Sequence, residues 1–219
     1  MAPLNKELQN SITPLKAIDL LKEGNSRFVN NLKINRNLLQ QANETSDGQN
    51  PFAVILSCID SRTSAELIFD QGLGDIFSIR IAGNILNEDI LGSMEFGCKI
   101  AAAKIIVVLG HTRCGAVQGA CDHIELGNIT SLLTKIRPAV EDETTTKENR
   151  NSTNEEFVEK VAAINVKRTV KAVTERSLIL KEMIEDGSIG IVGGIYDIST
   201  GIVTFYDETM KINAPRQPQ

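Results

Sequence analysis

The sequence has no tryptophan, only two histidines and only four cysteines among 219 residues. Four cysteines in a chain of this length exclude the disulfide frameworks of small secreted domains. The formal net charge is −5, so no basic excess points to nucleic acid. No run approaches the ~20 apolar residues of a membrane-spanning helix. Met1–Asn10 lacks an apolar signal-peptide core, so we expect a cytoplasmic protein, with a trimmed precursor as the alternative.

The remaining composition is typical of one globular domain. Hydrophobic residues make up 42% of the chain and charged residues 23%, which is enough for one sizeable core. We therefore expect a single domain over residues 1–219. Within it we expect an N-terminal helical arm at 1–45 and a C-terminal tail at 207–219, where two prolines and several polar residues occur.

Apolar runs that alternate with helical patterns predict an α/β fold with a mostly parallel sheet flanked by helices. Four strands are predicted at 52–57, 75–81, 104–109 and 188–195, and an antiparallel edge strand at 202–206. Helices are predicted at 63–71, 87–103, 114–123 and 128–141. A capping box at Thr153–Glu156 predicts one long helix that ends at Asp186–Gly187.

Thr13–Pro14 predicts the start of an amphipathic helix in the N-terminal arm. Such a helix can pack against its own domain or against a partner chain.

Two short motifs follow the first and third predicted strands. The first is Cys58-Ile59-Asp60-Ser61-Arg62, and the second is His111-Thr112-Arg113-Cys114. Each lies at a strand-to-helix corner, where open α/β sheets place ligand sites. Taken singly, such residues are more often a buried cysteine or a hydrogen-bonded histidine. Together they provide three zinc-type ligands without an evident fourth, which is the catalytic rather than the structural arrangement. Iron–sulfur ligation usually requires four cysteines.

The ligand set constrains the strand order. Zn–S bonds of ~2.3 Å and Zn–N bonds of ~2.0 Å require the two corners to meet. Neighbouring strands lie about 4.8 Å apart, so the first and third strands should be neighbours. We therefore predict the order 2-1-3-4 for the parallel strands, with the chain order reversing beside the metal.

The combined pattern Cys-x-Asp-Ser-Arg and His-x-x-Cys-Gly resembles the β-class carbonic anhydrases. The resemblance covers residues 45–207 and includes three further segments: Arg80–Asn84, Asp89–Phe96 and Gly110–Val117. It implies a zinc enzyme that reversibly hydrates CO₂ to bicarbonate and a proton. One Zn²⁺ per chain would be bound by Cys58, His111 and Cys114. Zinc-bound hydroxide, oriented by an Asp60–Arg62 dyad, would attack CO₂.

The spacing of Asp60 and Arg62 by itself fits a loop salt bridge as well as a catalytic pair. Arg62 can pair with Asp60 bidentately and keep it ionised. The resemblance favours the catalytic role. It also makes Asp60 a possible fourth zinc ligand in a closed state, which some family members adopt with bicarbonate bound by Trp, Arg and Tyr. Arg80 and Tyr196 match two of those positions, but Ile55 replaces the Trp, so we expect the open form.

The resemblance also implies a substrate pocket and an assembly. Gln49 matches a family glutamine that enters the partner subunit's site, and family N-terminal helices reach across to a partner. We therefore expect a homodimer or tetramer. Phe77 and Ala82 match apolar wall positions, Phe96 replaces a frequent Tyr, and the Gly115 backbone N–H can meet the substrate. From the residues alone, Phe77 and Phe96 fit a core position equally well.

Three rival functions stay open at this point. Hydrolysis of COS or CS₂ would use the same scaffold, because both substrates are linear and apolar. A non-catalytic zinc module has no need of the Asp60–Arg62 pair. A thiol redox protein would use Cys114 and Cys121, but their spacing is wrong for a Cys-x-x-Cys couple.

Overall fold

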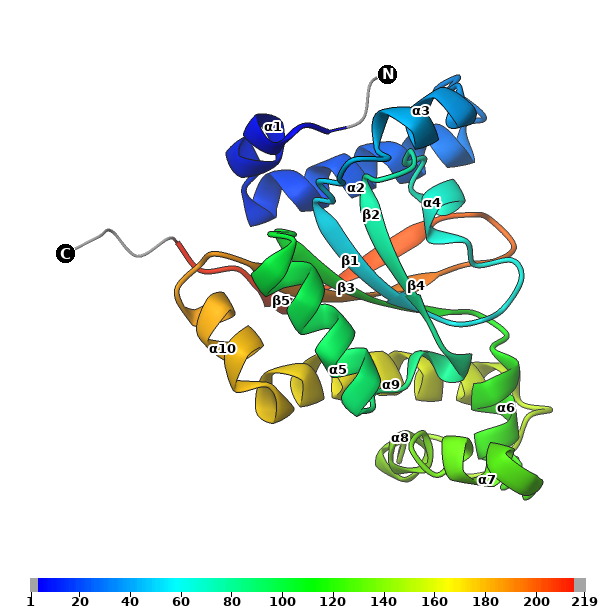
Figure 1. The fold of residues 1–219 in the computed structure, drawn as a ribbon. Coiled ribbons are helices and arrows are strands. Elements are labelled where there is room, and N and C mark those ends of the chain that lie inside the picture. Colours follow the sequence, from blue (N-terminus) through cyan, green and yellow to red (C-terminus); the bar gives the residue numbers. More distant parts are fainter. Residues whose placement is uncertain (1–3, 215–219) are drawn as a thin grey trace.

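The computed structural model describes residues 4–214, which form a five-stranded sheet with helices on both faces (Figure 1). The strand order is β2-β1-β3-β4-β5, and only β5 is antiparallel to its neighbour. This confirms the predicted order. The strands are β1 (Ala53–Ser57), β2 (Ile76–Arg80), β3 (Ile105–His111), β4 (Gly190–Tyr196) and β5 (Val203–Lys211).

The two central strands are buried along their whole length. Every residue of β1 and β3 is buried, as their continuous β-branched and aliphatic runs predict for strands covered on both faces. Ser57 of β1 pairs with Leu109 of β3, so both strands end at the same edge of the sheet. The residues that follow them therefore start as neighbours.

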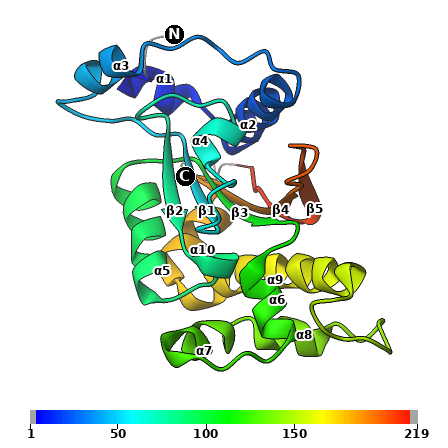
Figure 2. The ribbon, with the colours of Figure 1, turned by 90° about the vertical axis from the view of Figure 1, so that its right-hand side faces the viewer.

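The N-terminal arm covers one face of its own sheet (Figure 2). Helix α2 (Pro14–Val29) is capped by Thr13, whose side chain accepts a hydrogen bond from Lys16 N. Its buried Ala17, Ile18 and Leu21 belong to one apolar cluster with the central strands. The expectation that this helix reaches across to a partner is therefore wrong, because its apolar face is used within the chain. The same side of the sheet carries α1 (Lys6–Ser11), α3 (Leu38–Glu44) and α4 (Ala65–Ile68).

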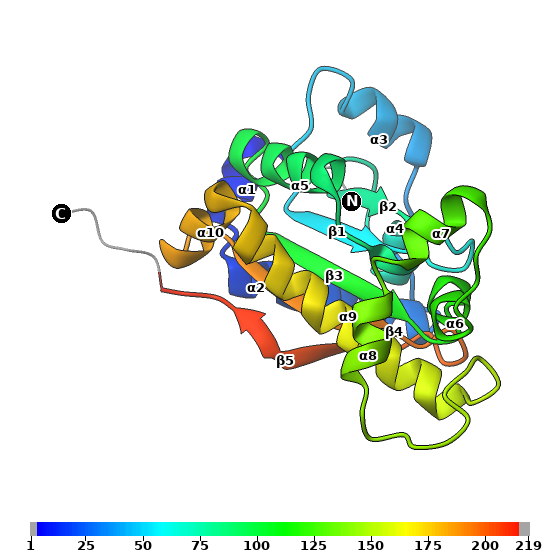
Figure 3. The same ribbon diagram turned by 90° about the horizontal axis from the view of Figure 1, so that it is seen from below.

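The opposite face is covered by α5 (Glu88–Glu95), a π-helical turn (Phe96–Ile100), α9 (Glu155–Arg176) and α10 (Leu178–Glu185). Helix α9 runs along β3 and β4 (Figure 3). The sequence predicts one long helix here, but Ser177 has extended backbone angles and caps α10. The cap of α9 is Asn154, which accepts from Phe157 N, and not Thr153 of the predicted capping box.

Three short helices lie beyond the carboxyl ends of the parallel strands: α6 (Gly115–Cys121), α7 (Gly127–Leu133) and α8 (Arg137–Asp142). The predicted helix 128–141 is thus two helices, with Pro138 in the first turn of α8. A 3₁₀ turn, η1 (Ala82–Asn84), follows β2. Among the described residues, none of the helices is long and apolar enough to cross a membrane.

The predicted tail begins later than position 207. Strand β5 continues through Lys211, because the sheet absorbs a bulge between Ile191 and Gly193. Thr209 fills this bulge, where its hydroxyl oxygen accepts a 2.8 Å hydrogen bond from Gly193 N. Residues 215–219 of the predicted tail, like residues 1–3 of the arm, lie outside the described residues.

Candidate metal centre

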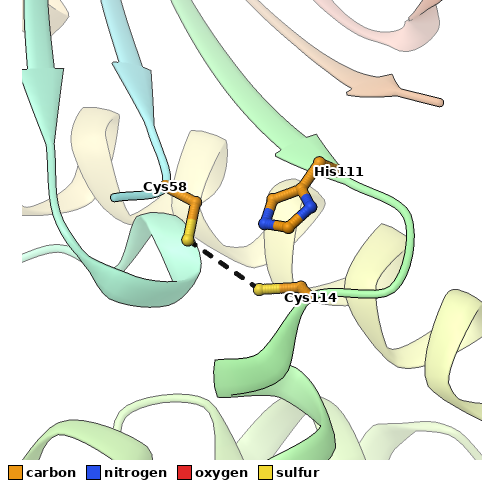
Figure 4. A group of neighbouring side chains, drawn as sticks. All are labelled: Cys58, His111 and Cys114. Carbon is orange, nitrogen blue, oxygen red and sulfur yellow. Dashed lines mark hydrogen bonds between the residues drawn. The ribbon is translucent and has the colours of Figure 1, made fainter. Parts of the chain in front are cut away.

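The three predicted ligands meet at the carboxyl edge of the sheet (Figure 4). Cys58 directly follows β1, His111 ends β3, and Cys114 is the N-cap residue of α6. Their ligand atoms all lie within 4.8 Å of one another, and all three residues are buried. The two sulfur atoms are 4.0 Å apart. This geometry fits a metal with two sulfur ligands and one nitrogen ligand.

The imidazole of His111 is oriented for ligation. Its Nδ1 lies 2.8 Å from the backbone oxygen of Thr112, which can only accept, so Nδ1 carries the proton. Nε2 is then a lone-pair donor, and it is buried without a hydrogen-bond partner in the described part of the chain. A backbone acceptor that fixes the tautomer is the usual support of a metal-bound histidine. A cation would satisfy the orphaned Nε2.

Backbone N–H groups surround both sulfur atoms. Gly83 N donates to Cys58 Sγ at 3.4 Å, and the N–H groups of Val117 and Ala116 in the first turn of α6 face Cys114. A hydrogen bond from the Cys114 thiol holds the pKa of Cys58 well below its usual value, and the same interaction raises the pKa of Cys114. The two sulfurs lie close enough to interact directly, and metal binding at such a site requires both to be deprotonated.

Asp60 and Arg62 form the predicted pair. Arg62 Nε donates to Asp60 Oδ1 at 2.9 Å, and Nη2 donates to Oδ2 at 2.7 Å. The Arg62 side chain thereby holds the pKa of Asp60 well below its usual range, so the carboxylate is ionised. Both oxygens face Arg62, and Asp60 is not part of the Cys–His–Cys group.

Two further side chains hold the loop between Cys58 and Asp60. Arg80 donates to the backbone oxygens of Cys58 at 3.1 Å and Asp60 at 2.6 Å. The Thr63 hydroxyl lies 3.0 Å and 2.9 Å from the same two oxygens. Tyr196 of β4 lies opposite His111 of β3 in the register of the sheet. The guanidinium of Arg80 is thus occupied by the protein's own backbone.

Only some of the predicted pocket residues lie near the ligands. Ala82 directly precedes Gly83. Apart from its chain neighbours and its own helix turn, no atom of the described residues lies within 4 Å of where a Gly115 side chain would begin. Gln49 precedes β1 and Cys58 follows it, so they are separated by the strand, ~17 Å for five residues. Within one chain, Gln49 is therefore not brought to the centre.

The two predicted wall phenylalanines pack against each other instead. Phe77 of β2 and Phe96 of the π-helical turn meet edge to face, with ring centroids 6.3 Å apart. They line a hollow over the sheet edge together with residues of α5, and Phe96 is 55% exposed. The single chain does not place them beside the ligands, so their contact with substrate stays a prediction.

Sequence reasoning missed the support that α9 gives to the His111–Cys114 loop and to the η1 turn that faces Cys58. Glu159 Oε1 accepts from Arg113 N at 2.8 Å, between the two ligands of the second motif. Asn165 Nδ2 donates to the backbone oxygen of Gly83 at 2.9 Å. A signal was available, because Asn165 interrupts the apolar face that Ala162 and Val166 mark on this helix.

Comparison with known proteins identifies the family. A family model described as carbonic anhydrase matches residues 53–203. The chain belongs to the carbonic anhydrase family. Carbonic anhydrase 2 of Mycobacterium tuberculosis is 35% identical over 206 residues, which cover 89% of this chain and 93% of that protein. The carbonic anhydrase of Mycolicibacterium smegmatis is 34% identical over 191 residues, covering 87% and 92%.

Solved structures identify the class. The β-carbonic anhydrase CafA of Aspergillus fumigatus superposes with a TM-score of 0.67 at 29% identity, covering 77% of this chain and 81% of that one. The β-carbonic anhydrase CcaA gives a TM-score of 0.68 at 27% identity, covering 87% and 95%. This carbonic anhydrase is therefore an enzyme of the β class, and its family implies reversible CO₂ hydration.

Proposed function

We propose that this carbonic anhydrase binds one Zn²⁺ per chain through Cys58, His111 and Cys114 and hydrates CO₂ reversibly. The observation that carries the proposal is the buried Nε2 of His111, which has no described hydrogen-bond partner and lies within 4.8 Å of both sulfur atoms. An imidazole and two thiolates are ligands that zinc prefers, and three protein ligands leave one position for the reaction. When bound, the metal supplies a Lewis acid that makes water a nucleophile near neutral pH.

The chain's residues then have separate tasks. Asp60 is ionised and held in a fixed orientation. It therefore accepts a hydrogen bond from the attacking water and so orients that water. Arg62 holds both carboxylate oxygens and prevents Asp60 from competing for the metal. Arg80 and Thr63 keep Asp60 at a constant position relative to Cys58.

The proposed substrate is small and apolar. CO₂ carries no charge that a side chain can grip, so it needs a small apolar space next to the nucleophile. Ala82 and the open space at Gly115 flank the ligands and support such a position. Phe77, Phe96 and Gln49 do not reach the centre in one chain. We assign them to the pocket through a second subunit, in a homodimer or a higher assembly of dimers.

The test measures metal and turnover on the same protein. The purified chain is expected to contain about one zinc per protomer, because three ligand residues define one site. Cys58→Ser and His111→Ala are expected to lose both zinc and CO₂ hydration in stopped-flow assays. Cys98→Ser is the matched control, since Cys98 is equally buried but lies in the core under α5. Full activity in zinc-free protein would refute the proposal.

A further inference from the structure

Gly83 links one metal ligand to a side chain of α9. Its backbone N–H donates to Cys58 Sγ at 3.4 Å, and its backbone oxygen accepts from Asn165 Nδ2 at 2.9 Å. Asn165 is 82 residues further along the chain and lies on the helix that backs β3 and β4. The Asn165 amide therefore anchors the carbonyl of Gly83, on the peptide unit next to the one whose N–H faces the sulfur.

The backbone of this turn adopts an uncommon conformation at two successive residues. Gly83 has φ of 64° and Asn84 has φ of 42°, so two successive residues are in the left-handed region. For a residue other than glycine this conformation is unfavourable and persists only where contacts enforce it. A side chain at Gly83 would begin 2.5 Å from Ile136 Cδ1, so the turn is also tightly enclosed. The direction of the Gly83 N–H thus depends on the contacts around it.

Asn165 is placed where the core alone would favour an apolar residue. It is 4% exposed, and the neighbouring buried positions on its helix face are Ala162 and Val166. Burying an amide among apolar side chains costs free energy unless the amide makes hydrogen bonds. The Asn165 amide makes such a hydrogen bond, which it donates to the Gly83 backbone oxygen. The position is therefore explained by the support it gives to the turn.

We propose that Asn165 is a positioning residue that aims the Gly83 N–H at Cys58 Sγ and so adjusts the sulfur as a metal ligand. The N–H···S bond stabilises the negative charge on the sulfur and fixes its direction, so that Cys58 is held ready to bind the metal. Supports of this kind around metal ligands commonly change metal affinity or activity by about 10–100-fold. The inference rests on the proposed metal site.

The first experiment compares two buried asparagines. Asn165→Leu removes the donor to Gly83. Asn25→Leu is the matched control, because Asn25 is also buried and its amide bonds backbone oxygens of Ile68 and Gly201, on the other face of the sheet. Each protein is loaded with Co²⁺, and a chelator competition gives its affinity. We expect Asn165→Leu to lose about 10–100-fold in affinity and to shift the sulfur-to-cobalt charge-transfer band. Asn25→Leu should match the unchanged protein in both.

A second measurement needs no variant. With ¹¹³Cd²⁺ bound to the unchanged protein, the Gly83 amide proton is expected to show scalar coupling to the metal through the sulfur. Equal affinities and equal spectra for the two leucine variants would overturn the role of Asn165. Absence of the coupling in a cadmium-loaded protein would overturn it as well. Neither result would affect the proposed metal site. A chain that binds neither Co²⁺ nor Cd²⁺ would instead refute the proposed metal site, and this role with it.

Discussion

At the scale of single residues, one carboxylate separates the possible uses of the site. Asp60 accepts hydrogen bonds from Nε and Nη2 of Arg62 and, at 2.9 Å, from the Arg62 backbone N–H. A loop salt bridge and a catalytic dyad would share this geometry. They differ in what happens when the charge is removed and the shape is kept.

We predict that Asp60→Asn retains zinc but lowers CO₂ hydration by a factor on the order of ten to a thousand, the scale of a positioned acid–base group. The amide keeps the size of the side chain and removes the anionic acceptor. Stopped-flow turnover together with metal analysis measures both quantities. Asp122→Asn is a suitable control, because Asp122 also accepts a backbone N–H, from Ser152, but lies outside the centre. Unchanged turnover in zinc-replete Asp60→Asn would defeat the mechanism.

Removal of the partner should act by another route. In Arg62→Ala the Asp60 carboxylate loses both side-chain hydrogen bonds and is free to move to the metal. We predict a zinc ion with four protein ligands, one of them a carboxylate oxygen, and a loss of activity comparable to that of Asp60→Asn. X-ray absorption at the zinc edge distinguishes this from the unchanged protein. A spectrum identical to that of the parent enzyme would contradict the prediction.

At the scale of elements, α9 and the loop before it form the support of the site. Glu159 connects α9 to the His111–Cys114 loop, and Asn165 connects it to the η1 turn that faces Cys58. The loop that leads into α9 is closed by Glu143, which is 2% exposed and pairs with Arg150 Nη1 at 2.8 Å. Burial raises the pKa of Glu143, but hydrogen bonds from Thr145 and Thr146 outweigh it and lower the pKa to about 2.

This lowered pKa predicts how the stability of the loop depends on pH. The ordinary pKa of Glu, ~4.3, is that of the unfolded chain, and the pKa of Glu143 in the folded chain is lower. As the pH falls, the folded protein therefore takes up this proton at a lower pH than the unfolded protein. The contribution of Glu143 is therefore complete above the unfolded pKa and is lost as the pH falls towards about 2. In urea unfolding, the deficit of Glu143→Gln should be largest near neutral pH and should shrink in acid.

Metal release in acid affects both proteins and cancels in the difference between them. Glu148→Gln, at an exposed position of the same loop, controls for the loss of charge and should show no such trend. A deficit of Glu143→Gln that is the same at every pH would count against the hydrogen-bonded Glu143 carboxylate as the source of loop stability.

At the scale of the whole molecule, the single chain brings the three candidate ligands together but leaves the predicted pocket residues apart. Gln49 lies at the amino end of β1 and the ligands lie at its carboxyl end. Phe96 is exposed at the edge of the sheet. A second copy that brings Gln49 to the centre would complete the pocket.

Mixing two inactive variants tests this arrangement. Cys58→Ser lacks a metal ligand but keeps Gln49. Gln49→Ala keeps the three metal ligands but lacks the Gln49 amide. If Gln49 acts across the interface, each mixed dimer contains one complete site. CO₂ hydration should then exceed the average of the two parents after the subunits are exchanged. Activity that stays at that average, with mixed dimers confirmed by native mass spectrometry, would exclude the cross-subunit role.

The sequence by itself determined that the three candidate ligands meet and that β1 and β3 are neighbours. Cys58, His111 and Cys114 follow two apolar runs, and the short bonds of a metal require the ends of these strands to be neighbours. The Asp60–Arg62 pair was also predictable, because two residues in one short loop can meet without help from the rest of the fold.

Only the tertiary structure decided which side chains support the site. The contact between Asn165 and Gly83 joins residues 82 positions apart, and no local pattern reports which groups packing brings together at that separation. The same reason explains why α2 was assigned to a partner. An apolar face indicates that a helix is covered, but it does not indicate by what. The three-dimensional packing decides this, and here the chain's own sheet covers α2.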